Sequence, residues 1–306
     1  MFLPLKDHNP TTIRPTVTIG LIALNCFVFL VELGHGPSLP YFIAHWGAVP
    51  YAFTHFGEVV AVGNNFPPTG GPSPFWITGI TSMFLHGGWA HLLFNMLFLW
   101  IFGNNVEDFL GHFRYLVFYI VTGLLGLCTH VLLHPSSTIP VVGASGAISG
   151  VLGAYMVLYP RARVTTLVFL LFFVTFIEVP AVVLLGFWII LQLFSGLGSL
   201  GHGGSGTAHW AHIGGFAAGY FILRFWLAKE LVSARRRVAA GAAASGGTFA
   251  EGFAAARARS SSSTTPGFFS TGDDYPPPPP KVGHRFGGDP IGNFLEEIER
   301  KDEDDS

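Results

Sequence analysis

The chain has 306 residues, of which 11% are charged, 50% are hydrophobic and 30 are Phe. About a quarter of the residues of a soluble domain are usually charged, so the composition excludes an ordinary soluble domain and indicates a polytopic membrane protein with about one membrane domain. The net charge of −2 says little, because 12 of the 18 acidic residues follow position 229. Cys26 and Cys128 both lie in apolar runs, so no disulfide framework is expected.

Six apolar segments approach the roughly 20 residues that a membrane helix needs. They are residues 16–33, 88–104, 113–133, 142–159, 180–196 and 207–227. The first segment is too long for a signal peptide and no A-x-A-like site follows it, so we expect a retained helix. The predicted fold class is therefore an all-α, six-helix membrane bundle.

The apolar stretch 164–179 raises the question of a seventh span. It is only about 16 residues long and carries Glu178 near its end. Irregular or short elements at membrane depth are tolerated where they pack on protein. We therefore expect a re-entrant or interfacial piece, such as a hairpin.

The distribution of basic residues supports six spans. All 16 Lys and Arg fall outside the loops 34–87, 134–141 and 197–206, and six spans put every one of them on the cytoplasmic side. A seventh span would move Lys229 and Arg235–Arg237 to the opposite face. The prediction is a short cytoplasmic N-terminus (1–15), a membrane domain (16–228) and both ends cytoplasmic.

Residues 229–306 form the third expected region. The composition changes to Ala, Gly, Ser and Pro, and the stretches SSSSTTPGFFSTG and PPPPP lack apolar periodicity. These features are typical of flexible linker and polyproline II. We expect a disordered cytoplasmic tail, with a docking peptide for an unknown cytoplasmic partner as the alternative.

Polar side chains gather near the starts of the second, fourth and sixth expected helices. In the six-span topology all three helices start at the outer face, and polar groups at such depth face the protein interior or a wet cavity. One level of the bundle therefore holds a candidate site. Its members are His86, His91, Asn95, Ser145, His209 and His212.

Glycines on the fourth and sixth helices explain how these side chains can meet. Gly143 and Gly146 flank Ser145, and Gly215 and Gly219 form a G-x-x-x-G pair. Small residues let membrane helices approach closely. Ser145 and His212 are then within hydrogen-bonding distance.

A serine beside a neutral imidazole suits nucleophilic catalysis, because the imidazole takes the hydroxyl proton. Asn95, the His91 ring N–H and the Ser145 backbone N–H are candidate donors to the developing oxyanion. Glu58 is the one acidic residue expected outside, and nothing places it near His212. The sequence therefore predicts a Ser–His dyad. The His spacing lacks a metal-ligand set, so neither a metal nor another cofactor is expected.

These residues resemble the rhomboid intramembrane serine proteases. The motifs are G-x-S-G at Gly143–Gly146, H-x-x-x-N at His91–Asn95 and A-H-x-x-G-x-x-x-G at Ala211–Gly219. Their order on the second, fourth and sixth helices is specific, and the resemblance covers about residues 14–228.

The resemblance implies a six-helix core whose site opens to the outer face and that cuts transmembrane proteins in or beside their membrane segment. Ser145 would be the nucleophile, His212 the base, and His91 and Asn95 part of the oxyanion hole. The loop 34–87 would be partly embedded beside the site. A bacterial inner membrane is the expected location, and lipid and transmembrane substrates, rather than nucleic acid, are the expected partners.

Two features depart from the family pattern. Some relatives carry an aromatic residue where this chain has Ser149, and some carry an Arg in the first loop, which has none here. Two other functions stay open. One is a catalytically inactive rhomboid-like protein that binds membrane clients. The other is a small transporter, although its polar sites would lie nearer the bilayer midplane.

Overall fold

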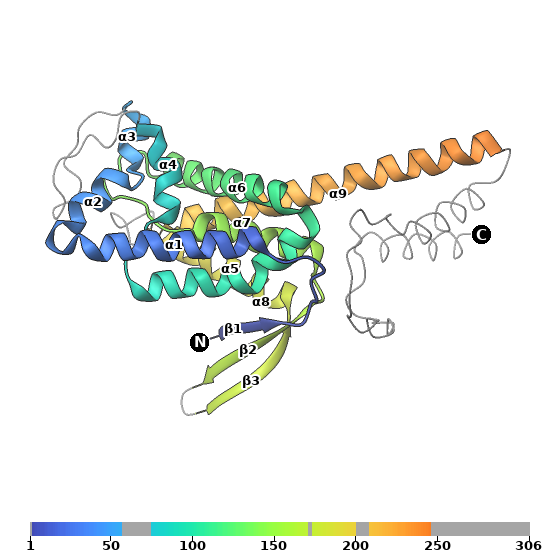
Figure 1. The fold of residues 1–306 in the computed structure, drawn as a ribbon, viewed down its shortest axis with the longest axis horizontal. Coiled ribbons are helices and arrows are strands. Elements are labelled where there is room, and N and C mark those ends of the chain that lie inside the picture. The colour runs from blue at the N-terminus through green and yellow to red at the C-terminus, as the bar shows by residue number, and fades with distance from the viewer. Residues whose placement is uncertain (1, 57–74, 171–172, 200–207, 246–306) are drawn as a thin grey trace, which may run out of the picture. The chain divides into compact units, whose positions relative to one another are not determined.

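The computed structural model describes residues 2–56, 75–170, 173–199 and 208–245 (Figure 1). The chain divides into two units, residues 1–224 and 225–306, and the site lies in the first. The longer helices are α1 (Thr16–Gly34), α5 (Trp89–Leu110), α6 (His112–Leu133), α7 (Ser145–Leu158), α8 (Ala181–Ser199) and α9 (His209–Ser245). The shorter elements between α1 and α5 are η1 (Gly36–Ser38), α2 (Leu39–Trp46), α3 (Pro50–Thr54), η2 (Phe75–Ile77), α4 (Thr78–Thr81) and η3 (Ser82–Phe84).

Each of the six segments expected to span the membrane overlaps one of the longer helices. Of the described helices, α1, α6 and α8 are by themselves long and apolar enough to cross a membrane. A fourth candidate is α5 together with the segment Phe75–Phe84, which meets it at a bend of 80°. The 14 residues of α7 reach only about 21 Å at 1.5 Å per residue. A membrane protein with a helical bundle is thus confirmed, whereas a count of six crossings stays a prediction.

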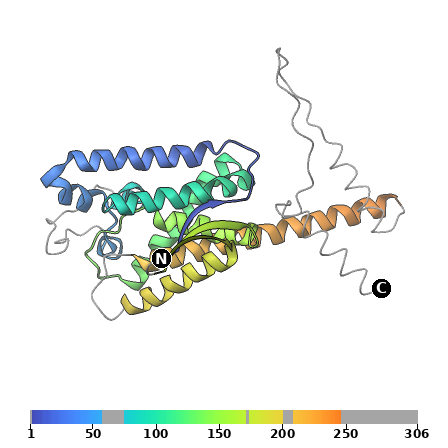
Figure 2. The ribbon, with the colours of Figure 1, turned by 90° about the horizontal axis from the view of Figure 1, so that it is seen from below.

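The outer faces of the long helices are apolar. Figure 2 has α1 and α8 on opposite sides of the bundle, and only 28% and 17% of their most apolar windows are buried in the protein. The exposed side chains of α8 include Phe187, Ile190, Leu191 and Phe194. Such a surface is what a helix in contact with lipid tails presents.

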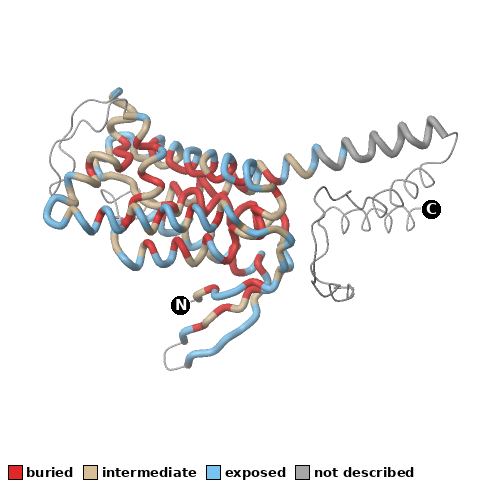
Figure 3. The backbone as a smooth tube through the Cα atoms, in the orientation of Figure 1, coloured by how far each residue is buried: buried red, intermediate tan, exposed pale blue. Residues whose placement is uncertain are grey.

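Helix α7 is the most enclosed helix of the bundle. Eleven of its 14 residues are buried, and it runs through the red central region of Figure 3. Its neighbour α9 comes so close that a Cβ at Gly215 would collide with the carbonyl oxygen of Gly146, and one at Gly219 with that of Gly150. Small residues at this contact permit the close approach.

A three-stranded antiparallel sheet accompanies the helices, unlike the all-α class expected. It comprises β1 (Phe2–Asp7), β2 (Arg163–Leu170) and β3 (Phe173–Pro180), in the order β1-β2-β3. The stretch 164–179, expected as a re-entrant or interfacial piece, is the β2–β3 hairpin, whose Val, Thr, Ile and Phe residues favour strands. β1 joins it through pairs such as Phe2 with Val168.

A buried carboxylate ties β1 to the end of α7 that lies nearer the sheet. Asp7 Oδ2 accepts hydrogen bonds from Tyr155 Oη at 2.9 Å and from Asn105 Nδ2 at 2.6 Å. Asn9 Nδ2 donates to Asn105 Oδ1 at 2.7 Å. The expected N-terminal segment 1–15 is therefore packed against α5 and α7.

A second buried carboxylate, Glu107 of α5, holds the start of α1. It accepts hydrogen bonds from the backbone N–H groups of Val17 and Thr18 at 2.9 and 2.8 Å and from the Thr18 hydroxyl at 2.7 Å. His112 Nδ1 lies 2.6 Å from Glu107 Oε1. The first amides of a helix have no intrahelical acceptor, so Glu107 supplies what α1 lacks.

The last helix extends beyond the expected membrane segment. α9 continues to Ser245, whereas the expected tail begins at residue 229. Ala, Arg, Lys and Glu dominate residues 228–245 and favour helix. Residues 246–306, which include the Ser-rich and Pro-rich stretches, lie outside the described residues.

Candidate active site

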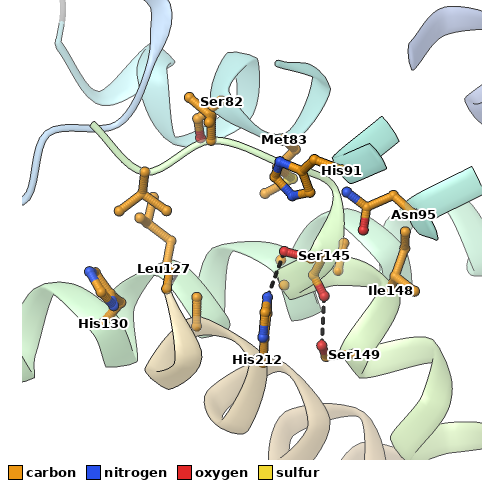
Figure 4. Close-up of a pocket in the computed structure, with 18 of the residues that line it drawn as sticks. Ser82, Met83, His91, Asn95, Leu127, His130, Ser145, Ile148, Ser149 and His212 are labelled. Carbon is orange, nitrogen blue, oxygen red and sulfur yellow. Dashed lines mark hydrogen bonds between the residues drawn. The ribbon is translucent and has the colours of Figure 1, made fainter. Parts of the chain in front are cut away.

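A cavity of about 540 Å³ lies at the start of α7 (Figure 4). Side chains from the five helices α5 to α9 and from the connecting segments line it. They include His91, Asn95, Leu127, Ser145, Gln192 and His212. His91, Asn95, Ser145 and His212, which come from segments far apart in the sequence, are thus brought to one cavity.

Ser145 is the first residue of α7, and the segment before it shapes the cavity wall. Gly143 has φ +122°, a backbone conformation that side chains rarely adopt. A Cβ there would also lie 2.7 Å from the His91 ring. Gly143 N–H donates to Ser82 O at 2.8 Å, which fixes the approach to α7. Gly143 is therefore required for the turn as well as for helix packing.

The hydroxyl of Ser145 and the imidazole of His212 face one another in Figure 4. Ser145 Oγ lies 2.7 Å from His212 Nε2, and His212 Nδ1 lies 2.9 Å from Gln192 Oε1. An amide oxygen only accepts hydrogen bonds, so His212 Nδ1 carries the proton and Nε2 is free to accept the serine proton. This tautomer is the one that a general base needs.

Gln192 of α8 has no counterpart among the residues predicted from the sequence. It is a single amide in an apolar helix, with no motif around it, and only its distances to the two histidines of α9 reveal it. Its Oε1 also accepts from His209 Nδ1 at 2.9 Å. Its neighbour on α8, Trp188, lies with its ring centroid 6.0 Å from that of His212.

Ser149, one of the two departures from the family pattern, does not stack on the histidine. Its hydroxyl donates to the Ser145 carbonyl at 2.6 Å. The aromatic ring beside His212 comes instead from Trp188 of α8. The aromatic contact of His212 thus comes from a helix other than α7.

His91 and Asn95, the two side chains predicted to donate to an oxyanion, both belong to α5. Gly87 N–H donates to His91 Nδ1 at 3.3 Å, so the proton of this ring is on Nε2, the atom that faces Gly143. In the described part of the chain, Asn95 Nδ2 is buried and has no hydrogen-bond partner. A buried donor without an acceptor costs about 1–3 kcal/mol, and a substrate oxyanion would supply that acceptor. The Ser145 N–H is the first amide of α7 and is directed away from the helix body.

The described parts of the first loop, 34–56 and 75–87, pack beside the cavity. Ala48 pairs with Val141 in an isolated bridge, and Thr81 Oγ1 donates to Trp46 O at 2.7 Å. These contacts anchor the loop without the Arg that some relatives carry.

The remaining polar residues of the sequence analysis lie around the site rather than in it. His86 is buried, and its backbone N–H donates to a Glu32 carboxylate oxygen at 3.0 Å. Glu58 lies outside the described residues. Among the residues that are described, no three His, Cys, Asp or Glu side chains are grouped to hold a metal ion.

Comparisons with known proteins agree with this geometry. The family model for the Rhomboid domain matches residues 74–229. The chain is 31% identical over 211 residues to Rhomboid protease GluP of Bacillus subtilis, which is 68% of this chain and 34% of that protein. It is 31% identical over 172 residues to Rhomboid protein 1, mitochondrial, of Saccharomyces cerevisiae, which is 53% of this chain and 44% of that protein. The similarity thus spans less than half the length of either relative.

Proposed function

Because this chain belongs to the rhomboid family, we propose that it is an intramembrane serine endopeptidase that cleaves transmembrane proteins within or next to their membrane segment. Ser145 is the nucleophile and His212 the general base. His91, Asn95 and the Ser145 backbone N–H form the oxyanion hole. The substrate is another membrane protein, and no cofactor takes part.

The proposed reaction follows from the protonation of the two rings. His212 Nε2 takes the proton of Ser145 Oγ as that oxygen forms a bond to the scissile carbonyl carbon. Negative charge moves to the carbonyl oxygen, where the Asn95 amide and the His91 Nε2–H can donate to it. His212 then gives its proton to the leaving amine as the C–N bond breaks. Water attacks the resulting ester by the same steps and releases Ser145.

The observation that carries this proposal is the 2.7 Å contact between Ser145 Oγ and His212 Nε2, with His212 Nδ1 held by an acceptor. A serine whose role was only to cap α7 would direct its oxygen to the backbone N–H groups of that helix. A structural histidine would not need Nε2 to be free of its proton.

The proposed orientation puts both termini in the cytoplasm and opens the cavity toward the outer face. It rests on the distribution of basic residues and on the position of Ser145 at the start of α7. The membrane domain is residues 16–228 with six crossings, and a bacterial inner membrane is the proposed location. A cytoplasmic partner of residues 246–306 belongs to the same proposal.

The second candidate is a catalytically inactive family member that binds membrane clients. The observation that suits this candidate is the cavity itself. A cavity of about 540 Å³ can hold a side chain of a client protein whether or not a peptide bond is cut.

A serine-directed probe separates the two candidates. We expect a fluorophosphonate to label the purified wild type in liposomes, and the wild type to cleave a model transmembrane substrate. Ser145→Ala abolishes both, and His212→Ala lowers both by at least about a thousandfold, because the hydroxyl loses its base.

Ser149→Ala is the matched control, because it removes a hydroxyl one turn along the same helix. It is expected to keep most of the labelling. A folded wild type that neither labels nor cleaves any of several transmembrane substrates would overturn the protease proposal and support client binding.

A further inference from the structure

We propose that Gln192 is a positioning residue that fixes His212 in the tautomer able to accept the serine proton. The catalytic consequence of this inference rests on the proposed protease function. The contacts of Gln192 with the two histidines do not depend on that proposal. Neither the family motifs nor the sequence pattern assigns Gln192 a role.

The contacts of Gln192 define which protons the rings hold. Its Oε1 lies 2.9 Å from the Nδ1 atoms of both His212 and His209. A carbonyl oxygen has two lone pairs and can accept two hydrogen bonds. Both Nδ1 atoms therefore carry protons, and the Nε2 atom of His212 faces Ser145 Oγ as an acceptor.

The opposite orientation of the same amide would have the opposite effect. A Gln192 NH₂ group facing the rings would donate to Nδ1 and leave the proton on Nε2. His212 would then donate to Ser145 Oγ and could not take its proton. The orientation of one amide thus decides whether the dyad has a base, and orientations of this kind are assigned from hydrogen-bond partners.

His209 brings a second ring nitrogen to the same amide oxygen. It lies three residues before His212 on α9, and the two ring centroids are 6.2 Å apart. Gln192 Oε1 therefore contacts both rings and can accept one hydrogen bond from each.

A neutral amide also suits this position better than a carboxylate does. Asp and Glu inside the membrane are costly unless they are paired. The amide orients His212 without introducing a charge into an apolar helix. The chain therefore uses Gln192 for the orientation that an acidic residue provides in a Ser–His–Asp triad.

Three variants of the full chain in liposomes test this role. Gln192→Met removes the acceptor at similar volume, and Gln192→Glu keeps an acceptor but adds charge. Trp210→Phe is the matched control, since Trp210 Nε1 donates to Gly196 O at 3.2 Å and forms another α8–α9 hydrogen bond. Each variant is assayed for kcat, KM and the pH profile of transmembrane substrate cleavage.

We expect Gln192→Met to lower kcat by about 10- to 100-fold, the usual cost of losing a group that orients an active residue, with KM nearly unchanged. Gln192→Glu keeps kcat within a few-fold, and the acidic limb of its pH profile moves to higher pH, because a carboxylate stabilises the imidazolium. Trp210→Phe leaves kcat and the pH profile close to the wild type. The proposal is overturned if Gln192→Met retains the wild-type kcat, if Trp210→Phe loses as much, or if Gln192→Glu is as impaired as Gln192→Met.

Nitrogen NMR of the histidine side chains gives a readout that does not depend on activity. With Gln192 present, we expect His212 to be protonated at Nδ1, and with Gln192→Met to populate both tautomers. A wild-type His212 protonated at Nε2 would overturn the proposal even in an active enzyme. Failure of the protease function alone would appear instead as the absence of fluorophosphonate labelling with the Nδ1 tautomer intact.

Discussion

The two ends of α7 differ in the kind of polar group that surrounds them. At its start, the Ser145 hydroxyl contacts the His212 imidazole, which in turn contacts the Gln192 amide. Toward its other end, Tyr155 donates to the Asp7 carboxylate, and Glu107 holds the start of α1 nearby. Neutral groups that can exchange protons gather at one end, and carboxylates at the other.

This difference separates chemistry from structural support. Charge-assisted hydrogen bonds are about twice as strong as neutral ones, and a carboxylate with several donors fixes the segments that supply them. The start of α7 instead keeps a buried donor, Asn95 Nδ2, unpaired within the described residues. Substitutions at the two ends should therefore affect different measurements.

The largest effect is expected from Asn95→Ala, a substitution on α5 in the cavity at the start of α7. Removing one oxyanion donor commonly lowers kcat by about 10²–10³-fold. Stability should change little, because Asn95 Nδ2 has no partner to lose. Cleavage of a model transmembrane substrate and thermal unfolding of the same preparation check the two parts. A variant that unfolds early but retains kcat per folded molecule would contradict the prediction.

Glu107→Gln tests the carboxylate end. The substitution keeps the volume but puts an NH₂ group among the donors of α1, so we expect a loss of about 2 kcal/mol in the free energy of unfolding. Activity per folded molecule should stay within about twofold. Denaturation in mixed micelles followed by circular dichroism measures the change.

Glu178→Gln is the control for this experiment at the same end of the bundle. Glu178 is half-exposed and pairs with Arg163 at 3.4 Å, and exposed pairs contribute at most about 1 kcal/mol. An equal loss in the free energy of unfolding for the two Glu→Gln variants would contradict the prediction that Glu107 stabilises the fold more than an exposed ion pair does.

Asp7→Asn gives the smallest effect, seen as a pH dependence. Burial raises the pKa of Asp7 above its ordinary value of 3.8, although its hydrogen bonds with Tyr155 and Asn105 act in the opposite direction. The folded state then binds the proton more tightly than the unfolded state. Its contribution is fully present below the unfolded pKa and is lost as the pH rises through the folded pKa.

The wild type should therefore lose stability relative to Asp7→Asn as the pH rises through the folded-state pKa of Asp7. Unfolding free energies of both proteins between about pH 4 and pH 7.5 measure this difference. Parallel curves over that range would show that Asp7 does not titrate differently in the two states.

Much of the site follows from the sequence because its residues sit in motifs. The small residues around Ser145 and the G-x-x-x-G pair after His212 predict that the two helices pack closely and that these two side chains come together. Gln192 carries no such signal, because one amide in an apolar helix is equally compatible with a structural role. Its part depends on the rotation of α8 relative to α9, which only the packed structure defines.

The fold follows the same division between local and long-range information. The helices α1, α6 and α8 depend on local sequence, since their apolar runs predict their bounds to within three residues, whereas α5 continues six residues beyond its expected end. The sheet is not local, because β1 pairs with a strand more than 150 residues later. The sequence analysis missed the extension of α9 to Ser245, because the Ala-rich end of this helix continues into a Gly-rich and Ser-rich stretch that resembles a linker.

The pairing of β1 with β2 constrains how the chain threads the bilayer. Hydrogen-bonded strands share one side of the membrane, so the chain between Asp7 and Arg163 must cross an even number of times. The helices α1, α5, α6 and α7 lie in that interval. If all four cross, as proposed, the failure of one to insert would leave β1 and β2 on opposite sides and the sheet could not form. The sheet can therefore form only when the chain between β1 and β2 has crossed the membrane an even number of times.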